Sequence, residues 1–205
     1  MHLFVKLYLL ISIAGSWDTT ANHQANVYGP PINTSDAVIY YTDQGVAPEK
    51  IVIGIPLYGR SFLNTNGPGT SFSGVGEGTW EAGAYDYRAL PLPGSTVYYD
   101  NAAIASWSYD TTKKEMISFD DEDCATDKAK WIVNQGLRGG MFWELSGDKG
   151  GTRDGGETGP GKDPQPGNSL VTVVKTVFGD LDQTSNWLTY GLSQYDNMKN
   201  GMPSS

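Results

Sequence analysis

Ile51-Val52-Ile53-Gly54-Ile55-Pro56-Leu57 decides the fold, because this stretch is continuously apolar and rich in β-branched residues. The pattern is typical of a parallel strand that is buried on both faces. A second stretch, Gly139-Gly140-Met141-Phe142-Trp143-Glu144-Leu145, predicts another buried strand. Together the two stretches indicate an α/β fold with a parallel sheet.

Helices are predicted before each strand and after the second one. Residues 35–45 have apolar side chains at helical spacing, with Ser35 or Asp36 as the N-cap. Residues 121–135 carry acidic side chains in their first turn, which favours a helix start. Residues 169–178 predict a third helix. The order helix, strand, helix, strand supports the α/β class.

The segments between these elements predict an insertion and a loop. Residues 60–118 are rich in Gly, Ser, Thr and Tyr, which predicts a small, mostly antiparallel α+β insertion. Its candidate strands are three short apolar stretches: 96–99, 104–109 and 116–119. Eight glycines and three prolines predict a flexible loop over 147–167, and the tail beyond Asp180 is expected to be irregular.

Residues 1–13 form an apolar run with one lysine, followed by the small residues Ala14, Gly15 and Ser16. The run is either a secretory signal or a buried strand, and it is too short to cross a bilayer as a helix. No other segment of the sequence is apolar for long enough to do so.

Length and composition exclude several classes of protein. The 205 residues suffice for one sizeable domain but fall short of the roughly 250 that a barrel of eight strand-helix units takes. A net charge of −9 disfavours nucleic acid and anionic membranes as partners. The single cysteine, Cys124, excludes an intrachain disulfide and a zinc ribbon. His2 and His23 cannot form a multi-histidine metal site, and we expect His23 to be an exposed loop residue.

Aromatic and charged residues gather next to the predicted strands. The set is Trp17, Tyr58, Arg60, Trp80, Glu81, Trp143 and Glu144. Sugar rings stack on indoles and present hydroxyls to charged side chains, so the mixture suits a carbohydrate cleft. The alternative is that the aromatics belong to the core. Side chains alternate along a strand, so Glu144 is expected to point away from Trp143 and to be structural. Glu81 and Asp86 are assigned equally to a substrate site or to a solvated surface.

Several segments together resemble the family 18 chitinases, especially the fungal secreted type. They are residues 14–18, 50–62, 80–83, 139–144 and 195–204. The resemblance implies the C-terminal part of an eight-stranded (β/α) barrel, strands six to eight, with an α+β insertion. The implied division is barrel at 1–59 with a non-family leader at 1–13, insertion at 60–118, barrel at 119–180 and tail at 181–205.

The resemblance also implies chemistry. Such enzymes cleave β-1,4-linked N-acetylglucosamine with retention, using the substrate acetamido oxygen as nucleophile and one glutamate as acid/base, without metal or cofactor. Trp143 is similar to the tryptophan under the sugar at the cleaved bond, and Tyr58 to an aromatic near its acetamido group. Arg60 and Glu81 resemble polar contacts to sugar, and Trp17 a platform on the leaving-group side.

Two family motifs differ here. The acid/base glutamate ends an Asp-x-x-Asp-x-Asp-x-Glu motif, which is absent from these 205 residues. Ile11 and Ser12 stand where the family has the Tyr and Asp of Met-x-Tyr-Asp. We therefore expect a C-terminal chitinase portion that is inactive alone. The alternatives are a non-catalytic chitin-binding remnant and a non-functional truncated product.

The expected partner is chitin or N-acetylglucosamine oligomers, with no nucleic acid and no membrane. The expected location is extracellular, and the sequon at 33–35 is compatible with secretion.

Overall fold

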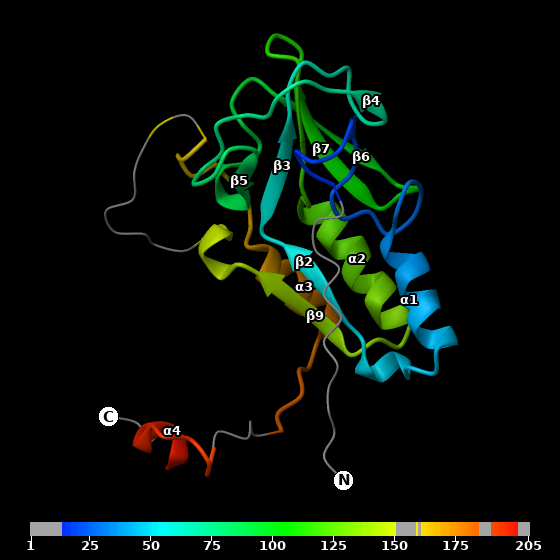
Figure 1. Cartoon of the computed structure of the whole chain (residues 1–205), viewed down its shortest axis with the longest axis vertical. Coiled ribbons are helices and arrows are strands. Elements are labelled where there is room, and N and C mark those ends of the chain that lie inside the picture. Colours follow the sequence, from blue (N-terminus) through cyan, green and yellow to red (C-terminus); the bar gives the residue numbers. More distant parts are fainter. Residues whose placement is uncertain (1–13, 151–158, 160, 185–189, 201–205) are drawn as a thin grey trace.

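A computed structural model describes residues 14–150, 159, 161–184 and 190–200 (Figure 1). The predicted leader at 1–13, including Ile11 and Ser12, lies outside the described residues. So do residues 151–158 and 160 of the predicted loop.

The two predicted strands form a parallel pair. Strand β2 (Val52–Pro56) runs beside β9 (Gly139–Trp143), in a register from Val52 opposite Gly139 to Pro56 opposite Trp143. Every residue of β2 is buried, as predicted. The prediction of a buried β9 is wrong, because its residues are half-buried and Trp143 is exposed. Within the described chain β9 has β2 as its one strand neighbour, so no other described strand pairs with its second edge.

An antiparallel sheet of five strands follows β2 directly, in the order β5-β3-β8-β7-β6. The strands are β3 (Tyr58–Phe62), β5 (Ala84–Asp86), β6 (Thr96–Asp100), β7 (Ala105–Asp110) and β8 (Glu115–Ser118). The three short apolar stretches are thus confirmed as strands. The sheet begins two residues before the predicted boundary at 60, and its helical content is one 3-10 turn, Tyr87–Ala89. A smaller antiparallel pair joins β1 (Thr20–Ala21) to β4 (Thr70–Ser71).

The predicted helices are present with corrected boundaries: α1 (Thr34–Asp43), α2 (Glu122–Asn134) and α3 (Leu170–Phe178). The N-cap of α1 is Asn33, and not Ser35 or Asp36. Its Oδ1 accepts from the Asp36 amide at 2.8 Å, and its Nδ2 donates to the Gly29 carbonyl at 3.0 Å. The tail holds a short helix, α4 (Asp196–Lys199), where irregular chain was expected. Two 3-10 turns occupy Pro48–Lys50 and Leu145–Gly147.

The main core lies between the strands and the helices α2 and α3. The buried side chains of β2 and its flanking residues, Ile51 and Leu57, pack there with apolar residues of both helices. One feature was not anticipated: Lys128 of α2 is buried and ion-paired with Asp120, at 2.6 Å from Nζ to Oδ2. No helix in the described part of the chain is long and apolar enough to cross a membrane.

Candidate functional site

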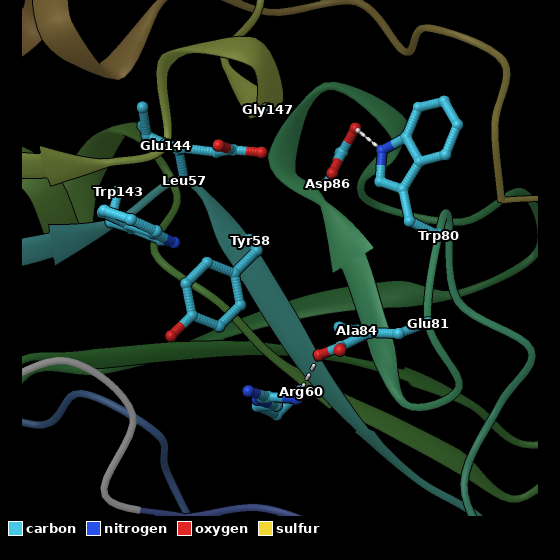
Figure 2. A pocket seen from close by; sticks show the side chains of 10 residues that line it. All are labelled: Leu57, Tyr58, Arg60, Trp80, Glu81, Ala84, Asp86, Trp143, Glu144 and Gly147. Atoms are coloured by element: carbon cyan, nitrogen blue, oxygen red, sulfur yellow. Dashed lines mark hydrogen bonds and ion pairs between the residues drawn. The ribbon is translucent and has the colours of Figure 1, made fainter.

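A pocket of about 510 Å³ opens where β2 turns into β3 (Figure 2). It lies beside the end of β9 and the start of the five-stranded sheet. Its lining consists of Leu57, Tyr58, Arg60, Trp80, Glu81, Ala84, Asp86, Trp143, Glu144 and Gly147. Of the five predicted substrate-binding residues, four line this pocket, and they lie up to 85 residues apart in the sequence.

Two indoles present exposed faces at the pocket. Trp143 ends β9 and is 57% exposed, and Trp80 is 55% exposed. Figure 2 shows them on opposite sides of the pocket, with Tyr58 nearer to Trp143. Large aromatic faces exposed to water in a concave site are typical of ligand platforms, since core aromatics bury both faces. The alternative of a core role is therefore wrong for Trp80 and Trp143.

Arg60 contacts three of the other predicted residues, Glu81, Tyr58 and Trp17. Its Nη1 donates to Glu81 Oε1 at 3.2 Å. Its guanidinium carbon lies 5.3 Å from the centroid of the Tyr58 ring and 5.5 Å from that of Trp17. Both distances are within the range of a cation–π contact, so the arginine contacts two aromatic rings. Trp17 is 63% exposed and joins the site through Arg60 rather than through the pocket lining.

Asp86 holds one of the indoles in place. Its Oδ2 accepts from Trp80 Nε1 at 3.0 Å and from Arg88 Nε at 2.9 Å. The Arg88 guanidinium carbon also lies 6.0 Å from the Trp80 ring centroid. The carboxylate and the guanidinium are both largely buried, so the ion pair is shielded from solvent. Asp86 is thus not the solvated surface residue that one interpretation allowed.

Glu144 lines the pocket, so the expectation that it points out of the site and is only structural is wrong. Side chains do not alternate across Trp143 and Glu144, because β9 ends at Trp143. The chain then enters the 3-10 turn, where the Gly147 amide donates to the Glu144 carbonyl at 2.9 Å. The Glu144 carboxylate accepts from Ser146 Oγ at 2.9 Å and is otherwise open to solvent.

Gln24 supports the backbone at Tyr58, and it was not among the site residues predicted from the sequence. The side chain is buried, and its Nε2 donates to the Tyr58 carbonyl at 2.6 Å. Its backbone amide donates to Ser118 Oγ at 3.0 Å, which fixes the segment against β8. No local signal could have found it, because both partners are distant in sequence.

Cys124 and His23, the described residues that could serve as a nucleophile or a metal ligand, do not line the pocket. Among the described residues, no group of three His, Cys, Asp or Glu side chains is placed to hold a metal ion. Burial raises the pKa of the Cys124 thiol well above its ordinary value, and nearby Asp120 raises it further, so the thiol stays protonated. His23 is half-buried with its ring centroid 5.2 Å from that of Trp107, so its expected exposure is wrong, and burial lowers its pKa.

Comparison with known proteins identifies the family. A model of the glycosyl hydrolases family 18 matches residues 4–148, which is more than half of the chain. The chain belongs to this family. The match includes residues 4–13, most of the stretch expected to be a non-family leader.

Relatives and solved structures within family 18 agree with this assignment. Chitinase 1 of Aphanocladium album is 42% identical over 196 residues, which cover 92% of this chain and 43% of that protein. The chain thus spans less than half the length of this curated relative. Chitinase ChiA74 from Bacillus thuringiensis superposes with a TM-score of 0.70 at 29% identity, over 87% of this chain and 32% of that one. A class V chitinase from Nicotiana tobaccum, solved in complex with NAG4, shares the fold with a TM-score of 0.67 at 21% identity, over 83% and 47% of the two chains.

Proposed function

We propose that the pocket binds chains of β-1,4-linked N-acetylglucosamine and belongs to a chitinase. The observation that carries this proposal is the exposed Trp143 indole beside the Arg60–Glu81 ion pair, in a chain of family 18. The likeness to a fungal chitinase and to a structure solved with NAG4 supports the same ligand class.

Each pocket residue has a role that its surroundings favour. Trp143 offers a flat apolar face to a sugar ring, and Tyr58 lies beside it to contact the acetamido group. The Arg60–Glu81 pair presents donors and acceptors for hydroxyl groups. Trp17, which contacts Arg60, extends the proposed binding surface on the leaving-group side.

We propose that binding by this chain occurs without hydrolysis. A glycosidase needs a carboxylic acid that holds a proton until the bond breaks. The described carboxylates of the pocket are engaged in other contacts: Glu81 and Asp86 are each ion-paired with an arginine, and Glu144 accepts a hydrogen bond from Ser146. The absence of the Asp-x-x-Asp-x-Asp-x-Glu motif from the sequence agrees with this.

The division of the chain is also proposed. We assign β2 and β9 to the seventh and eighth strands of the family's barrel, and the five-stranded sheet to its α+β insertion. The parallel β2–β9 register and the direct passage from β2 into β3 support this division. By the same family argument, the protein is proposed to act outside the cell.

The test is binding of the N-acetylglucosamine tetramer by calorimetry, with release of reducing ends measured in parallel. Trp143→Ala should abolish binding, whereas Tyr40→Ala, which removes an exposed aromatic of α1 away from the pocket, should leave it intact. Equal loss in both variants, or no binding by the unmodified chain, would refute the assigned pocket. Trp143-dependent cleavage would support a chitinase and overturn the proposal that the chain is inactive.

A further inference from the structure

The carboxylates that line the pocket differ in whether a cation compensates them. Glu81 is paired with Arg60, and Asp86 with Arg88. Within the described chain, Glu144 has no cationic partner, and its recorded hydrogen bond comes from the neutral Ser146 hydroxyl. Among the described residues that line the pocket, the one negative charge without a cationic partner is therefore that of Glu144.

The position of this charge is specific. Glu144 adjoins Trp143, the proposed platform for one sugar ring. Figure 2 shows its carboxylate extending toward Asp86 and the side of the pocket where Trp80 lies. A sugar chain that passes from Trp143 toward Trp80 would bring its next unit beside this carboxylate.

The 2-position of a chitin unit carries either a neutral acetamide or, after deacetylation, an ammonium group. A carboxylate accepts a hydrogen bond from both, but the bond from the ammonium is charge-assisted and stronger. The unit on Trp143 must keep its acetyl group if the acetamido oxygen is to act as nucleophile. Selection for a free amine can therefore act only on a neighbouring unit.

We propose that Glu144 selects partially deacetylated chitin by pairing with the ammonium group of the unit next to the one stacked on Trp143. This inference rests on the proposed function of the pocket and names the substrate class more narrowly. The restriction to a neighbouring unit follows from the family's substrate-assisted mechanism, whereas the proposed ion pair itself requires no cleavage of the bound sugar.

The experiment compares the fully acetylated tetramer with the four tetramers that each carry one free amine, at a pH where the amine is protonated. Glu144→Gln removes the charge while keeping the shape and an acceptor for Ser146. Glu49→Gln removes the same charge at an exposed site beyond the opposite end of β2, which controls for the net charge of −9. For one amine position, Glu144→Gln should weaken binding about threefold more than it weakens binding of the acetylated tetramer, as for a solvent-exposed ion pair.

The outcomes separate the two proposals. Equal loss of affinity in Glu144→Gln and Glu49→Gln would overturn the proposed role of Glu144 but not the pocket. Equal loss for acetylated and deacetylated tetramers in Glu144→Gln would do the same. Absence of Trp143-dependent binding for every tetramer would overturn the pocket itself, and this inference with it. The selective effect of Glu144→Gln should disappear above the pH at which the amine of the oligomer loses its proton. A preference for the deacetylated tetramer that persists above this pH would count against an ion pair.

Discussion

The buried ion pair of Lys128 and Asp120 gives the sharpest test of how the fold is held together. Asp120 follows β8 and Lys128 lies in α2, so the pair fastens the five-stranded sheet to that helix. Lys128 Nζ lies 2.7 Å from Oδ1 and 2.6 Å from Oδ2, and both side chains are 4% exposed. The remaining neighbour of the carboxylate, Cys124 Sγ at 3.5 Å, is a weak donor.

Lys128→Met should therefore leave a buried carboxylate without a cation. Breaking a buried pair from one side costs about 3–5 kcal/mol, because the second charge stays desolvated. Lys130→Met is the matched control, since Lys130 lies in the same helix and forms an exposed pair with Asp127 at 2.9 Å. Lys130→Met should lower the free energy of unfolding by about 0–1 kcal/mol.

Urea unfolding followed by circular dichroism measures both free energies, with the slope m checked for constancy. The double variant Asp120→Leu with Lys128→Met should recover most of the lost stability, because it removes both buried charges. If Lys128→Met costs no more than Lys130→Met, the pair is not desolvated as described, and the reasoning fails.

The same pair predicts a pH dependence. Burial is the largest single effect and lowers the pKa of Lys128, but the charge of Asp120, the hydrogen bond to it and the other nearby groups together outweigh burial, so the pKa is raised above its ordinary value. The stabilisation is then complete below the unfolded pKa of about 10.4 and is lost as the pH rises through the folded value. The stability difference between the unmodified chain and Lys128→Met should stay constant from about pH 7 to about pH 10 and narrow above it. A narrowing that begins near neutral pH would contradict the raised pKa.

Three further predictions concern the cap, the pocket and the loop. Asn33→Ala should lower the unfolding free energy by about 1 kcal/mol, whereas Asn33→Asp should retain most of it as an alternative N-cap; equal losses would contradict the capping role. Asp86→Ala releases the indole of Trp80, so calorimetry should detect about fivefold weaker binding of the acetylated tetramer, worth about 1 kcal/mol. Hydrogen bonds from the side chain and backbone of Asn168 lower the pKa of Glu122, so its stabilisation is present above the unfolded pKa of about 4.3 and lost as the pH falls through the folded value. The stability difference between the unmodified chain and Glu122→Gln should shrink in acid, and one that is independent of pH would refute the assignment.

The elements with strong local signals could be predicted from the sequence. The run at 51–57 is apolar throughout and became β2, and the acidic first turn of α2 marked its start correctly to within a residue. The start of α1 could not be fixed in this way, because Asn33, Thr34, Ser35 and Asp36 are all residues that can cap a helix. The choice of Asn33 depends on its bond to the Gly29 carbonyl, which only the folded loop supplies.

The types of residue that form the candidate site were predicted from the sequence, but some of its residues were not. The family resemblance named Trp143 and Arg60, whereas Glu144 was excluded by assuming that strand alternation continued past the end of β9. Gln24 has partners 34 and 94 residues away, at Tyr58 and Ser118, so no pattern within its own segment could indicate its role.

The stretch that decides the fold also assembles the pocket. Pro56 lies opposite Trp143 in the parallel pair, and Tyr58 lies opposite Asp86 in the antiparallel sheet. Leu57, fully buried between the two, donates its amide to the Trp143 carbonyl at 2.8 Å and accepts at 2.9 Å from the Tyr87 amide. Because one continuous segment pairs first with β9 and then with β5, the indole platform and the ion-paired wall are held at a fixed separation by backbone hydrogen bonds. The apolar run that stabilises the core is therefore also the element that determines which side chains meet at the site.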